Sequence, residues 1–134
     1  MGNFEKIYSE SEIILTEGAI AERLKAGFKA EMDSFINHAG LIYSNPGILE
    51  FLYNQYIDIG RKYNLPIMMM TPTRKVNYES IRKSKFPDRD IISDTCLFLN
   101  KIRDSYPGYS SKILSGGLLG CKGDAYSSED ALGV

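Results

Sequence analysis

The sequence lacks several features that mark specialised classes of protein. It has no tryptophan, one histidine and two cysteines among 134 residues. Its 16 lysines and arginines are balanced by 17 aspartates and glutamates, so no excess of positive charge is present to attract nucleic acid or an anionic membrane. Apolar runs such as IMMM at residues 67–70 are far shorter than the roughly 20 residues that cross a bilayer. Neither nucleic acid nor a membrane is expected as a partner.

The N-terminus and the cysteines favour a cytoplasmic location. The first 12 residues, MGNFEKIYSESE, are polar and lack the apolar core of a signal peptide, and Lys6 departs from the myristoylation pattern. Cys96 and Cys121 fall in different expected elements, without the spacing of a disulfide framework or a zinc site. We therefore expect two reduced thiols, with a bridge or a zinc pair as the alternative.

Short apolar runs alternate with helical patterns along the chain. Continuous runs at residues 12–16, 66–73 and 112–117 predict strands, the first two buried. A short helix is expected over residues 19–25 and longer ones over 46–63 and about 88–106. In the first long helix, the predicted apolar stripe comprises Ile48, Leu52, Tyr56, Ile59 and Tyr63. The basic stretch at residues 74–87 is interpreted as a solvated surface.

Alternating strands and helices indicate an α/β fold with parallel strands and right-handed crossovers. In such folds the functional groups lie at the carboxyl ends of the strands. Here those ends carry Glu17-Gly18, residues 71–73 and the glycine-rich loop at 116–126. A capping-box pattern at residues 127–130 predicts a further helix, and we expect this chain to be part of a longer one.

Three segments at these strand ends resemble motifs of the homocysteine S-methyltransferase family, which includes betaine- and S-methylmethionine-dependent enzymes. LTEGA at residues 15–19, with Glu22 after it, resembles the first-strand motif, in which Asp usually replaces Glu17. TPTRKVN at residues 71–77 is similar to the second-strand segment of one bacterial branch. Residues 115–126, ending in Gly-Asp-x-Tyr, are similar to the third-strand segment. The motifs occur in the family's order and the resemblance spans residues 13–130.

The resemblance implies the N-terminal half of a TIM (β/α)8 barrel, of which residues 1–134 supply about the first three strands. It also implies a zinc-dependent methyltransferase that forms methionine. A methyl group moves from a sulfonium or ammonium donor to the thiol of homocysteine or a similar thiol, which zinc holds as thiolate. The family's zinc ligands would lie beyond residue 134, so this chain is expected to hold no metal ligand or catalytic residue and to be inactive alone.

A substrate-binding role falls, by the same resemblance, on Glu17, Gly18, Thr71, Thr73, Asp124 and Tyr126. Glu17 would face the amino group of the substrate. Each side chain also has a structural explanation in turn formation, capping or loop packing. His38, the only histidine, is expected in a loop or on the surface.

Two other functions stay open. One is a small α/β module that binds an anion or nucleotide through the glycine-rich loop, although that loop lacks the phosphate-loop spacing. The other is a non-catalytic assembly fragment that self-associates through exposed sheet edges.

Overall fold

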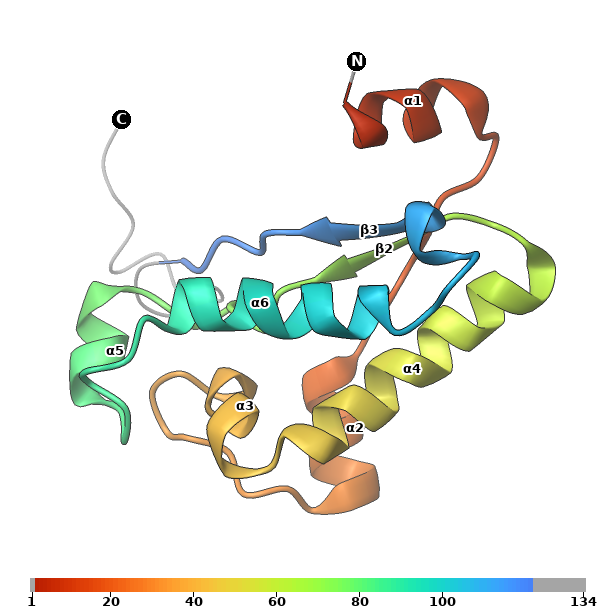
Figure 1. Cartoon of the computed structure of the whole chain (residues 1–134). Coiled ribbons are helices and arrows are strands. Elements are labelled where there is room, and N and C mark those ends of the chain that lie inside the picture. Colours follow the sequence, from red (N-terminus) through yellow and green to blue (C-terminus); the bar gives the residue numbers. More distant parts are fainter. Residues whose placement is uncertain (1, 122–134) are drawn as a thin grey trace.

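The computed structural model describes residues 2–121 (Figure 1). A parallel sheet contains β1 (Leu15–Thr16), β2 (Ile67–Met70) and β3 (Ile113–Gly116), in the order β1-β2-β3. Ile67 pairs with Leu15 on one side and with Ile113 on the other. The predicted α/β class with parallel strands is therefore confirmed. Asp124, Tyr126 and the expected capping box lie outside the described residues.

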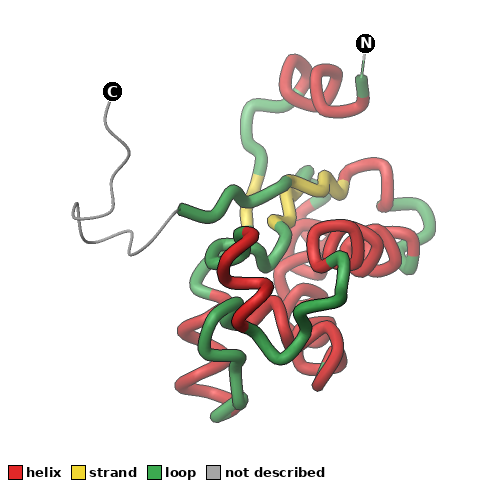
Figure 2. Tube along the Cα trace, turned by 90° about the vertical axis from the view of Figure 1, so that its left-hand side faces the viewer, coloured by secondary structure: helices red, strands yellow, loops and turns green. Residues whose placement is uncertain are grey.

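The longest helices cover one face of the sheet. α4 (Pro46–Tyr63) precedes β2 and α6 (Ile91–Asp104) precedes β3, and both lie on the same side in Figures 1 and 2. The apolar core lies between them and the sheet, with Ile57, Ile67 and Leu99 among its most buried members. The remaining helices are α1 (Asn3–Glu10), α2 (Ile20–Phe28), α3 (Leu41–Ser44) and α5 (Tyr78–Lys83), with 3₁₀ turns at His38–Gly40 and Ser110–Lys112.

Capping explains where two of these helices begin. Asp90 accepts a hydrogen bond from the Ser93 N–H, so α6 begins at Ile91 and not at the predicted Pro87-Asp88. Asn77 and Ser80 form a reciprocal cap at the start of α5, within the basic stretch at residues 74–87 that was interpreted as a solvated surface. α1 was not predicted either, and none of its residues is buried.

The prediction that the first strand is buried on both faces is wrong. β1 has only two residues, Thr16 is exposed and the preceding Ile13 is 55 % exposed. Within the described part of the chain, β1 pairs only with β2 and forms an edge of the sheet. An edge strand has fewer neighbours to cover its side chains, which explains its exposure.

Candidate functional site

The carboxyl ends of the strands are joined by a cluster of hydrogen bonds that uses both predicted threonines. The hydroxyl oxygens of Thr71 and Thr73 lie 2.7 Å apart. Thr73 donates to the Leu118 carbonyl at 2.5 Å, and the Leu118 N–H donates to Thr71 Oγ1 at 3.0 Å. The two hydroxyls thus fasten the loop after β3 to the loop after β2.

Gly120 brings these two loops into close backbone contact. A Cβ atom at this position would lie 2.8 Å from the carbonyl oxygens of Arg74 and Val76. Any side chain would therefore force the loops apart. The observed role of this glycine is tight packing of one loop against the other.

A small pocket of about 160 Å³ opens beside this cluster and is lined by Glu17, His38, Tyr53, Thr71 and Arg74, among others. The structure thus brings together Glu17 and Thr71, which were predicted as site residues from separate strand ends. Burial raises the pKa of the Glu17 carboxyl, and a backbone hydrogen bond from Met70 partly opposes that shift. The Tyr53 hydroxyl is already used, because it donates to the Met70 carbonyl at 2.9 Å.

Gly18 contributes its backbone to the edge of this region. Its carbonyl accepts a hydrogen bond from the Tyr56 hydroxyl. The sharp turn after β1 is made by Ala19, whose φ of 54° lies in the left-handed region.

His38 lines the same pocket, and the expectation of a loop or surface histidine missed its burial. Its side chain is only 6 % exposed, and Nδ1 has no hydrogen-bond partner in the described structure. Burial, together with the positive charges of Arg74 and Lys25, lowers its pKa from 6.5 to about 4. The imidazole is therefore neutral at pH 7.

The backbone before His38 is held in an unusual conformation. Asn37 has φ 55° and ψ −133°, which are strained values for a residue with a side chain. The Asp33 carboxylate fixes this segment by accepting hydrogen bonds from the N–H groups of Phe35, Ile36 and Lys85 at 2.8, 3.0 and 2.9 Å. These bonds outweigh burial and lower the pKa of Asp33.

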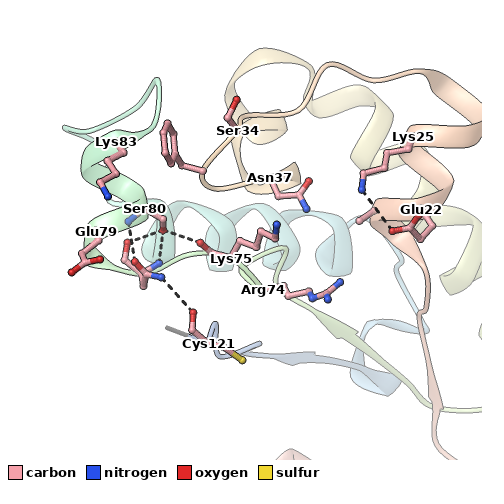
Figure 3. A pocket seen from close by; sticks show the side chains of 13 residues that line it. Glu22, Lys25, Ser34, Asn37, Arg74, Lys75, Glu79, Ser80, Lys83 and Cys121 are labelled. Carbon is pink, nitrogen blue, oxygen red and sulfur yellow. Dashed lines mark hydrogen bonds and ion pairs between the residues drawn. The ribbon is translucent and has the colours of Figure 1, made fainter. Parts of the chain in front are cut away.

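A larger cavity of about 550 Å³ adjoins the small pocket, and the two share Ala21, Glu22 and Arg74 (Figure 3). We call it the basic cavity, because it is lined by Lys25, Arg74, Lys75 and Lys83 and by only two carboxylates, Glu22 and Glu79.

The described residues do not fit a zinc site. No group of three or more histidine, cysteine, aspartate or glutamate side chains within residues 2–121 could hold a metal ion. Cys96 and Cys121 are both free thiols on exposed positions. Among the helices described, none combines the length and the apolar character needed to cross a membrane.

Comparison with known proteins does not identify a relative. No family model matches the chain, and neither does any curated protein or solved structure.

Proposed function

We propose that this chain is the first part of a cytoplasmic (β/α)8-barrel methyltransferase and that its small pocket binds the amino-acid end of homocysteine or a similar thiol. The observation that carries the proposal is the meeting of Glu17 and Thr71 in one pocket at the carboxyl edge of a parallel sheet. The sequential strand order, with α4 and α6 on one face, is also the arrangement of successive units in such a barrel (Figure 1).

The pocket has the chemistry to recognise a zwitterion. The Glu17 carboxylate would accept hydrogen bonds from the substrate ammonium group, and the Arg74 guanidinium would face its carboxylate. A pocket of about 160 Å³ suits a ligand of this small size. Because burial raises the pKa of Glu17, the approach of an ammonium group would stabilise the ionised carboxyl.

The described residues bind and orient; they supply no group for the transfer itself. Zinc belongs to the proposal only as a component of the intact protein, with ligands beyond residue 134. The methyl donor, a sulfonium or ammonium compound, is likewise assigned to the intact enzyme.

Calorimetric titration of this chain with L-homocysteine tests the proposal. Glu17→Gln removes the charge and keeps the shape, and we expect the affinity to fall by about ten- to a hundredfold, the value of a hydrogen bond to a charged group. Glu12→Gln is the matched control on the same segment, at an exposed position, and should bind as the parent does.

A second ligand identifies the group that Glu17 contacts. 4-Mercaptobutanoate keeps the thiol and the carboxylate but lacks the amino group. The parent and Glu17→Gln should bind it equally weakly. If Glu17→Gln binds homocysteine as tightly as the parent does, or if the parent does not bind homocysteine, the proposal fails.

A further inference from the structure

The basic cavity is built mainly from three separate stretches of the chain, with Cys121 added from the loop after β3. α2 contributes Lys25, the segment before the His38 turn contributes Phe35 and Asn37, and the stretch from residue 74 to 83 contributes the remaining lysines (Figure 3). A volume of about 550 Å³ falls within the usual range of small-molecule sites. The basic cavity is much larger than the neighbouring small pocket and can hold a separate ligand.

Positive charge is concentrated here although the whole chain carries a formal charge of −1. Four cationic side chains face two carboxylates, and one of these, Glu22, forms an ion pair with Lys25 at 3.8 Å. Figure 3 shows Lys75 and Asn37 extending toward the middle of the cavity and Glu79 at its outer side. Ammonium and amide donors that converge in this way are suited to phosphate oxygens.

An aromatic wall completes the cavity. Phe35 lines it and is 45 % exposed. A half-exposed ring beside cationic groups offers a stacking surface for the planar ring of a ligand. Such stacking accepts any nucleobase, because every base has a flat π face. The glycine-rich loop contributes Cys121 to the lining, whereas Gly120 packs against backbone carbonyls. Among the described residues that line the cavity, the lysine and asparagine side chains are donors.

We propose that the basic cavity is a second binding site, for a small nucleotide-class molecule, with the phosphates against Lys75 and Lys83 and the ring against Phe35. This site goes beyond the proposed methyltransferase function, because it places an anionic ligand next to the small pocket that is proposed to bind the thiol substrate. The two sites share Arg74, so a ligand bound in one site would change the affinity of the other site for its ligand.

Calorimetric titration with ADP, tripolyphosphate and adenosine tests the site. The parent chain should bind ADP more tightly than tripolyphosphate, and adenosine least. Lys75→Gln combined with Lys83→Gln should weaken ADP and tripolyphosphate binding by about tenfold or more. Phe35→Ala should weaken ADP binding and leave tripolyphosphate binding unchanged. Added salt should weaken the binding of both ADP and tripolyphosphate.

Lys101→Gln is the matched control, an exposed lysine on α6 outside the cavity. Thermal melts of every variant check that the fold is retained. The proposal is overturned if the parent binds neither anion at millimolar concentration, or if Lys101→Gln weakens binding as much as the cavity variants do. If Phe35→Ala weakens the binding of ADP and of tripolyphosphate equally, the proposed stacking of the ligand ring on Phe35 is wrong.

Discussion

At the scale of single residues, the buried His38 side chain makes the stability of the fold depend on pH. Its pKa is lowered from 6.5 to about 4, so between these values the unfolded chain binds a proton that the folded chain does not. The free energy of unfolding should therefore decrease as the pH falls from 6.5 to about 4. By linkage, the total loss is at most about 3 kcal/mol.

Urea unfolding of the parent and of His38→Gln at about pH 7 and about pH 4.5 measures this contribution. The parent should lose more stability than the variant on acidification. Glu17 acts in the opposite direction, since its raised pKa gives stability that is present at low pH and lost as the pH rises. His38 is the only histidine, so the difference between the two proteins isolates it. Equal pH dependence would contradict the buried, neutral imidazole.

Sequence reasoning found the residues at strand ends and missed those placed by loop geometry. Glu17 and Thr71 directly follow strands, so their convergence could be predicted. The position of His38 depends on the φ angle of Asn37 and on a hydrogen bond from the Lys85 backbone to Asp33, 52 residues away in sequence. Composition and periodicity carry no information about this backbone angle or this hydrogen bond.

At the scale of elements, the extent of α4 was predictable but its buried face was not. Helix formation over 46–63 is confirmed, yet two members of the predicted stripe, Ile59 and Tyr63, are 51 % and 61 % exposed. The buried positions are Leu49, Leu52, Tyr53, Ile57 and Gly60. The error arose because apolar residues occur on two neighbouring faces of this helix, so their periodicity alone does not decide which face is buried.

Gly60→Ala should destabilise the protein even though alanine favours helices. A Cβ at Gly60 would overlap the Tyr109 hydroxyl and approach the Leu65 carbonyl to 3.3 Å. Tyr109 is only 5 % exposed and donates to that carbonyl at 2.5 Å, so it cannot move without losing the bond. Overpacking should exceed the gain in helix propensity, leaving a net loss of about 1–2 kcal/mol in urea unfolding.

Gly27→Ala is the matched control, because this glycine lies in α2 with nothing within 4 Å of an added Cβ. There we expect a gain of up to about 1 kcal/mol. Removing the hydroxyl with Tyr109→Phe should also abolish the penalty at Gly60 in a double-mutant cycle. A stabilising Gly60→Ala in the parent would show that the helix and Tyr109 are less tightly packed than described.

At the scale of the whole molecule, alternation of strands and helices was sufficient to predict a parallel α/β fold. It was not sufficient to decide whether the sheet closes. Closure into a barrel depends on the number of strands, their tilt and their register shift. Three strands are compatible with a barrel segment or with an open sheet, so this part of the prediction stays a prediction.

The face of the sheet opposite α4 and α6 is only partly covered by the described residues. Met68 and Met70 alternate with the core residues Ile67 and Met69, so they lie on this opposite face, and both are partly exposed. Leu114, which pairs with Met68, is buried. Both methionine sulfur atoms lie close to Gly116, which shows that they pack along the sheet. Of the helices in residues 2–121, only α1 lies on this side in Figures 1 and 2.

This half-covered face, together with the outer edges of β1 and β3, predicts that the chain self-associates. Its mass in size-exclusion chromatography with light scattering should rise with concentration. Met68→Lys places a charge on the partly exposed centre of the face and should shift the chain toward monomer. Leu97→Lys, at a 62 % exposed position on α6 away from this face, should not. A parent chain that stays a monomer at every concentration would contradict the prediction, as would equal effects of the two substitutions.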